Sequence, residues 1–138
     1  MQSDVKRGDF VARAGEDLTD KEGYLAYVTH DAGVPEVKLP SAISDLALFL
    51  ILDGAEDGEN VALRPLEPGM SVRGVLEGTC NPGDVLVLAA IAGEDAGMVR
   101  ALPTAGGTYR GLGIAMEKGV DGQHILMQAS MIGNITVT

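Results

Sequence analysis

The sequence predicts a mainly β protein: a compact, small domain of the β-barrel or β-sandwich kind, with an extended N-terminal arm and at most one or two short helices. Nineteen glycines and six prolines are spread along all 138 residues at short intervals, which is the spacing of turns in a many-stranded protein. Hydrophobic residues make up 46 % of the chain and charged residues 22 %, a composition typical of folded domains. At this length one core is enough, so we expect residues 10–138 to form a single β-rich domain and residues 1–9 a flexible arm.

Eleven short segments between the breaks alternate or run apolar, and they have the length of strands. Ser71–Glu77 alternates with period two, which places Val72, Gly74 and Leu76 on one face. Leu46–Leu52 is apolar on both faces; periodicity does not separate a central strand from a buried helical turn, and we interpret it as a strand. The expected strands are Asp9–Arg13, Tyr24–Thr29, Glu36–Leu39, Leu46–Leu52, Asn60–Arg64, Ser71–Glu77, Asp84–Ala90, Met98–Leu102, Tyr109–Glu117, His124–Ala129 and Ile135–Thr138.

The segments between the strands carry recognisable turn residues. Asn81–Asp84 has Pro82 and Gly83 at the central positions, which predicts a type II turn between the sixth and seventh segments. Asp53–Glu59 has no hydrophobic residue larger than alanine and is expected to be an exposed loop. Ser41 is the candidate cap of one helical turn over Ser41–Asp45. Gly111 and Gly113, inside a strand, indicate places where another stretch of backbone comes close.

Charge and aromatic content restrict the partners. Ten Lys and Arg against twenty Asp and Glu give a net charge of −10, which disfavours phosphate backbones and anionic membrane surfaces. The chain has no Trp, two Phe and three Tyr, so stacking on nucleic-acid bases is unsupported. The N-terminal residues lack the apolar stretch of a secretory signal, and the longest apolar run is too short to span a bilayer. We therefore expect protein partners, with no direct nucleic acid and no membrane.

No catalytic or metal-binding motif is found in the sequence, and we expect no cofactor and no enzymatic activity. Cys80, the single cysteine, excludes an internal disulfide and is interpreted as a small buried hydrophobe. The acidic loop Asp53–Glu59 lacks the spacing of a calcium loop. The glycines of 106–113 match neither phosphate-binding fingerprint. The alternative hypothesis is a small β-barrel enzyme or ligand-binding domain with a site around His30 and His124, joined by Asp31 and Asp121; closeness of the two histidines would favour it.

The order of the strand and turn segments resembles that of the small head decoration, or capsid cement, proteins of tailed bacteriophages. The segments that carry the resemblance are Val5–Asp9, Ala14–Leu18, Gly23–Val28, Gly69–Val75, Pro82–Leu88 and Gly111–Glu117. Two acidic stretches, Asp53–Glu59 and Gly93–Gly97, have no match in that family.

The resemblance implies a structural virion protein without catalytic residues. It would be made in the host bacterial cytoplasm, form a homotrimer on the outer surface of the capsid, and stabilise the head by bridging major capsid proteins. The N-terminal arm would contact the shell, and its capsid-binding residues would be Val5, Lys6, Arg7, Gly8 and Asp9.

Overall fold

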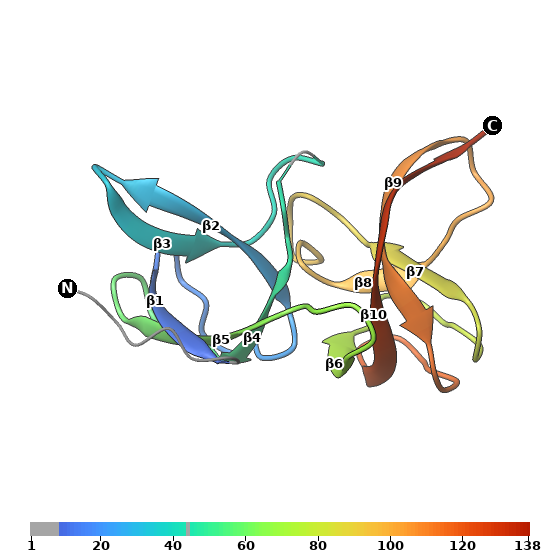
Figure 1. Ribbon diagram of the computed structural model, residues 1–138, viewed down its shortest axis with the longest axis horizontal. Coiled ribbons are helices and arrows are strands. Elements are labelled where there is room, and N and C mark those ends of the chain that lie inside the picture. Colours follow the sequence, from blue (N-terminus) through green and yellow to red (C-terminus); the bar gives the residue numbers. More distant parts are fainter. Residues whose placement is uncertain (1–8, 44) are drawn as a thin grey trace.

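Two β units lie side by side along the long axis of the molecule (Figure 1). The computed structural model describes residues 9–43 and 45–138. These residues form ten strands and no helix, so none of the described segments is a helix that could cross a membrane. The strands are β1 (Phe10–Ala14), β2 (Leu25–Asp31), β3 (Val34–Lys38), β4 (Phe49–Asp53), β5 (Asn60–Pro65), β6 (Ser71–Val75), β7 (Val85–Leu88), β8 (Val99–Ala101), β9 (Gly107–Ala115) and β10 (His124–Val137).

The first unit is a closed barrel of five strands in the order β1-β3-β2-β4-β5. Strand β1 closes it by pairing in parallel with β3 and antiparallel with β5. The rings of Phe10 and Phe49 meet edge to face, with centroids 5.5 Å apart. The interior is filled by small and branched aliphatic side chains, as expected for a narrow barrel: Ala14, Leu18, Ala26, Val37, Ile51, Val61 and Leu63.

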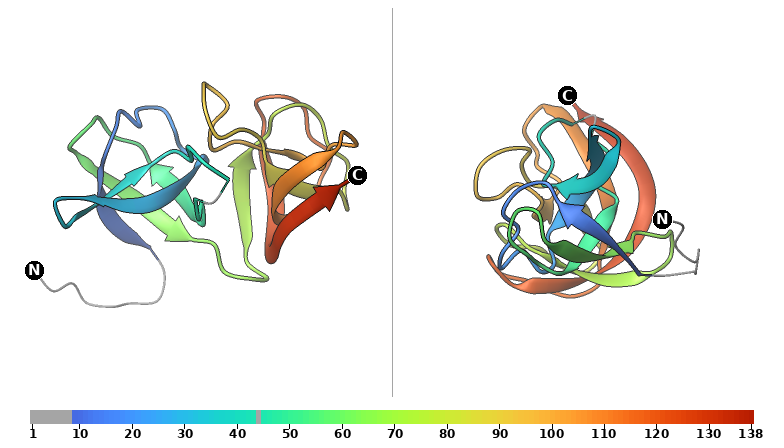
Figure 2. Two further views of the ribbon diagram at one scale, coloured as in Figure 1. Left: turned by 90° about the horizontal axis from the view of Figure 1, so that it is seen from above. Right: turned by 90° about the vertical axis from the view of Figure 1, so that its left-hand side faces the viewer.

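The second unit is a five-stranded sheet in the order β6-β10-β9-β7-β8. Its two outer strands approach each other beyond β6, where Leu76 forms a parallel bridge with Val99. The Glu77 amide donates a 2.8 Å hydrogen bond to the Val99 carbonyl. The sheet therefore curls nearly into a second barrel, as the view from above shows (Figure 2).

One hydrophobic cluster joins the two units. Leu25 and Leu50 from the barrel pack in the same cluster as Leu86 and Ile125 from the second sheet, and all four are 5 % exposed or less. A main-chain hydrogen bond also crosses between the units: the Leu25 amide of β2 donates to the carbonyl of Gly97, which precedes β8, at 2.8 Å. Burial of this apolar surface ties the units together.

The expected strands agree with the structure over most of the chain, and the mainly β fold is confirmed. Two expected segments, His124–Ala129 and Ile135–Thr138, are parts of the one long strand β10. Gly133, which lies between these two segments, has a φ of +81°, a conformation that usually interrupts a strand. Here the pairing with β9 shifts register between Ala129 and Gly133, so that β10 continues past the glycine. The strand expected from Leu46 begins only at Phe49, and Leu46 is 56 % exposed.

The expected helical turn at 41–45 is wrong in the described residues there. The Asp45 carboxylate accepts hydrogen bonds from the backbone amides of Ser41 and Ala42, at 2.8 and 2.9 Å, and from the Ser41 hydroxyl at 3.1 Å. The Asp45 amide donates to the Ala42 carbonyl at 3.0 Å. These bonds close a tight turn, in which the aspartate accepts the bonds and the serine does not act as a helix cap.

The expected turn at Asn81–Asp84 is confirmed. The Asp84 amide donates to the Asn81 carbonyl at 3.1 Å, and Gly83 has a φ of +91°. The turn connects β6 to β7 in the chain, yet β10 and β9 lie between those strands in the sheet. A glycine at the third position is required because other residues rarely adopt that φ.

Candidate functional site

Asp9, the first residue that the structure describes, forms a bidentate ion pair with Arg64. The Arg64 guanidinium on β5 donates from Nε to Asp9 Oδ1 at 2.8 Å and from Nη2 to Asp9 Oδ2 at 3.1 Å. The hydrogen bond from Arg64 lowers the pKa of the Asp9 carboxyl. Of the expected arm residues, Asp9 is therefore anchored to the barrel, whereas Val5, Lys6, Arg7 and Gly8 lie outside the described residues.

The two candidate histidines are not brought together. His30 lies near the tip of the β2–β3 hairpin of the barrel, where its Nδ1 accepts a 3.1 Å hydrogen bond from the Gly33 amide. His124 begins β10 in the second sheet and pairs with Val75 of β6. The two side chains line separate hollows that share no residue. The shared histidine site of the alternative hypothesis is not formed.

The acidic partners suggested for that site have structural contacts of their own. Asp31 ends β2, and its carboxylate lies 3.9 Å from Arg13. Asp121 accepts a 2.9 Å hydrogen bond from the Gly78 amide. Neither carboxylate is placed beside both histidines.

Cys80 and the acidic loop take the positions that the sequence predicts. Cys80 is 3 % exposed, and burial raises the pKa of its thiol. The acidic residues of the loop Asp53–Glu59 are exposed, while the loop backbone is tied to the barrel: Leu18 donates to the Ala55 carbonyl and Gly58 to the Ala14 carbonyl. Among the residues that the structure describes, no group of three or more His, Cys, Asp and Glu is arranged to hold a metal ion.

The close approach expected at Gly111 and Gly113 is confirmed. A Cβ atom on Gly113 would lie 2.3 Å from the Gln128 carbonyl oxygen, and one on Gly111 would lie 2.9 Å from the Gly133 carbonyl oxygen. Both contacts are with strand β10. The two glycines therefore allow β9 and β10 to pack at a distance that a side chain would prevent.

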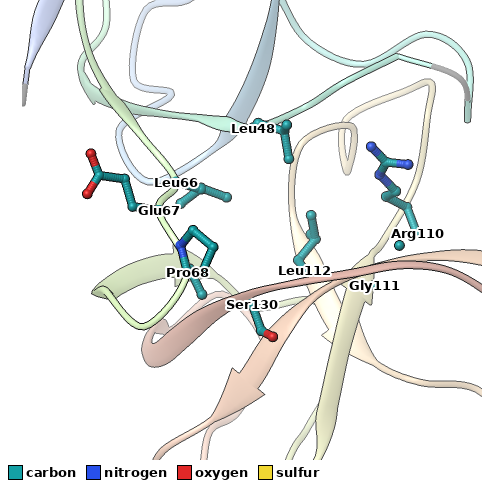
Figure 3. A pocket seen from close by; sticks show the side chains of 10 residues that line it. Leu48, Leu66, Glu67, Pro68, Arg110, Gly111, Leu112 and Ser130 are labelled. Atoms are coloured by element: carbon teal, nitrogen blue, oxygen red, sulfur yellow. The ribbon is translucent and has the colours of Figure 1, made fainter.

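An apolar cavity of about 70 Å³ lies where the barrel meets the second sheet (Figure 3). Leu48, Leu66 and Pro68 line it from the barrel side, and Leu112 and Ser130 from β9 and β10. It is about half the size of an engineered cavity of ~150 Å³ that binds benzene. The cavity has room for one aliphatic side chain.

Arg110, which also lines this cavity, was not among the candidate residues. Its guanidinium makes one hydrogen bond, from Nη1 to Asn134 Oδ1 at 3.4 Å, and no carboxylate among the described residues forms an ion pair with it. Arg100 and Lys118 likewise form no ion pair among those residues. The place of Arg110 beside a cavity follows from the pairing of β9 with β10, which single-sequence patterns do not specify.

No known protein family matches this chain, and no curated protein matches it either. Among solved structures, the fold is similar to that described as "The crystal structure of head fiber gp8.5 N base in bacteriophage phi29". The TM-score is 0.63 and the sequence identity is 16 %, with 91 % of this chain and 95 % of that chain covered. The two chains share a fold over nearly their whole lengths.

Proposed function

We propose that this chain is a structural protein of a phage virion, which binds the outer surface of the capsid and stabilises the head by bridging major capsid proteins. The observation that carries the proposal is the likeness of its fold, over 91 % of the chain, to a phage head fiber base. Its strand and turn segments resemble those of capsid cement proteins, which supports the same location. The proposed role is structural and not enzymatic.

The shape and charge of the molecule suit a bridging role. The barrel and the second sheet lie along the long axis and share a core, so each unit offers its own outer surface to a different neighbour in the shell. A net charge of −10 gives the protein little affinity for the packaged nucleic acid. The proposed partners are the major capsid protein and further copies of this chain in a homotrimer.

We assign the attachment to the residues that precede β1. The bidentate bond from Arg64 to Asp9 fixes where those residues leave the barrel, because two parallel charge-assisted bonds define an orientation as well as a distance. Val5, Lys6, Arg7 and Gly8 would then extend onto the shell from a constant point. An extended segment gains affinity by adding main-chain hydrogen bonds to a partner strand.

The experiment compares attachment to purified heads assembled without this protein. The full chain, a chain lacking Met1–Gly8, and the variant Asp9→Asn are each incubated with the heads, and the bound fraction is measured after sedimentation. We expect the full chain to bind saturably, the truncated chain to bind weakly, and Asp9→Asn to lie between them. Exposed Asp57→Asn in the acidic loop is the matched control and should bind as the full chain does.

Two results would contradict the proposal. Absence of saturable binding by the full, folded chain would remove the capsid function altogether. Equal binding by the full and truncated chains would leave capsid attachment standing and remove the arm as its anchor.

A further inference from the structure

Two double-stranded ribbons project beyond the paired parts of their sheets, at opposite ends of the molecule (Figure 1). The first, the outer hairpin, comprises residues 28–35 of β2 and β3; β4 pairs with β2 only at Leu25 and Ala26. The second, the outer ribbon, comprises Gly107–Arg110 of β9 and Asn134–Val137 of β10. Strand β6 leaves β10 after Gln128, and β7 pairs with β9 only from Gly111 onward.

Each of these ribbons has open strand edges. The barrel is closed, and the outer strands of the second sheet meet at Leu76 and Val99. An open edge presents unpaired amides and carbonyls that readily pair with another chain. On the outer hairpin, Pro35 blocks the β3 side because it has no N–H, which leaves the β2 side available.

The outer ribbon lacks the charges that usually protect an edge from pairing. Residues 128–138, which include the β10 part of the ribbon, contain no Lys, Arg, Asp or Glu, although the whole chain contains thirty such residues. Thr136 and Asn134 point to solvent, and Ile135 and Val137 are half-buried. The one charge on the ribbon is Arg110, which has no carboxylate partner among the described residues.

The outer hairpin has complementary chemistry. Val28 and Val34 are 41 % and 46 % exposed, which is high for aliphatic side chains on strands. Its one formal charge is Asp31, whose side chain is 76 % exposed and meets Arg13 only at 3.9 Å. His30 Nδ1 accepts a hydrogen bond from the Gly33 amide within the same hairpin. One end of the molecule therefore has a strand edge with exposed valines and a carboxylate. The other end has the β10 edge, which contains no charged side chain, beside Arg110 of β9, which forms no ion pair among the described residues.

We propose that the β2 edge of the outer hairpin of one copy pairs with the β10 edge of the outer ribbon of a second copy. Main-chain hydrogen bonds join the strands, the valines cover the aliphatic face of the ribbon, and Asp31 lies toward Arg110 of the neighbouring copy. The two surfaces are different, so the contact is head-to-tail, and repetition of such a contact closes a ring when the rotation permits. This deepens the homotrimer part of the proposed function by naming its interface.

The test measures association in solution by sedimentation velocity, without capsids. Val28→Lys places a cation on the hairpin edge, and Thr136→Lys places one on the ribbon edge beside Arg110. Each variant alone should raise the dissociation constant by about tenfold or more, because each puts an unpaired charge into the contact. Val11→Lys, at an exposed valine on the closed barrel, and Thr79→Lys, in an exposed loop, are the matched controls and should associate as the unmodified chain does.

Mixing the two variants distinguishes this interface from a symmetric one. Val28→Lys keeps its ribbon and Thr136→Lys keeps its hairpin, so an equimolar mixture should form a dimer of one copy of each and grow no further. A monomeric unmodified chain at the highest soluble concentration, undiminished association of either variant, or a mixture that stays monomeric would each overturn the proposal. Circular dichroism confirms that each variant is folded. Failure of capsid binding with the ring intact would refute the proposed function and leave this interface standing.

Discussion

Replacing Gly113 by alanine should destabilise the fold by about 2 kcal/mol. The added Cβ would lie 2.3 Å from the Gln128 carbonyl oxygen and 3.0 Å from Met127 Cε. The carbonyl belongs to the paired strand β10 and has no rotamer by which to move away, so the clash takes the upper end of the ~1–3 kcal/mol typical of overpacking. Alanine also has less conformational freedom than glycine in the unfolded chain, which stabilises the folded state by about 0.4–1 kcal/mol. The difference is a net destabilisation of about 2 kcal/mol.

The assay is equilibrium unfolding in urea, with Gly106→Ala as the control. A Cβ on Gly106 would have its nearest neighbour at 3.4 Å, the Val137 carbonyl oxygen, which is ordinary contact. Gly106→Ala should therefore unfold within about 0.5 kcal/mol of the unmodified protein. Gly113→Ala should also lower Tm by roughly 6–10 °C for a chain of this size. Equal stability of the two variants would show that β9 and β10 are not held at the close approach described here.

Three further outcomes follow from the structure. Leu25→Ala, in the barrel, should lower the free energy of unfolding by about 2–5 kcal/mol. Because Leu25 lies in the shared core, amide exchange should show that both units are destabilised together. Destabilisation of the barrel alone would refute the shared core. The bond from Arg64 lowers the pKa of Asp9, and the Leu126 amide followed by Arg73 lowers that of Glu117. The stabilisation from these two carboxylates is complete above their ordinary pKa values of 3.8 and 4.5 and is lost as pH falls through the lowered values. Asp9→Asn and Glu117→Gln should therefore make the free energy of unfolding less dependent on pH in the acid range. An unchanged pH dependence in either variant would contradict this. The buried Cys80 thiol should react with a thiol reagent at least about tenfold more slowly in the folded than in the urea-unfolded protein, and equal rates would refute its burial.

Local pattern predicted most of the strands, because glycine and proline mark many of the turns in this chain. Ser71–Glu77 shows the alternation that the structure reports, with Val72, Gly74 and Leu76 buried. Val75, on the other face, is also buried, against Ala89 and Met98. A second packing partner on that face is a tertiary fact, and alternation in one strand does not reveal it.

The order of strands within the sheets depended on long-range pairing, which the sequence alone did not predict. Neighbours in the chain such as β6 and β7 are separated by β9 and β10, so the correct turn at Asn81–Asp84 did not identify the pairs. The same limit applied to the candidate site. Arg110 was identified only once the structure placed it beside the cavity, whereas His30 and His124 were chosen by residue type and proved to lie in different sheets.

The shared core also determines how a disturbance at one end of the molecule is felt at the other. Leu25 of the barrel and Ile125 of the second sheet are both fully buried in the same cluster, and well-packed interiors deform little under load. If a partner reorients the barrel, the second sheet and the outer ribbon should therefore rotate with it as one rigid body. Binding of the barrel to a partner would then fix the orientation of the outer ribbon before a second copy of the chain binds there.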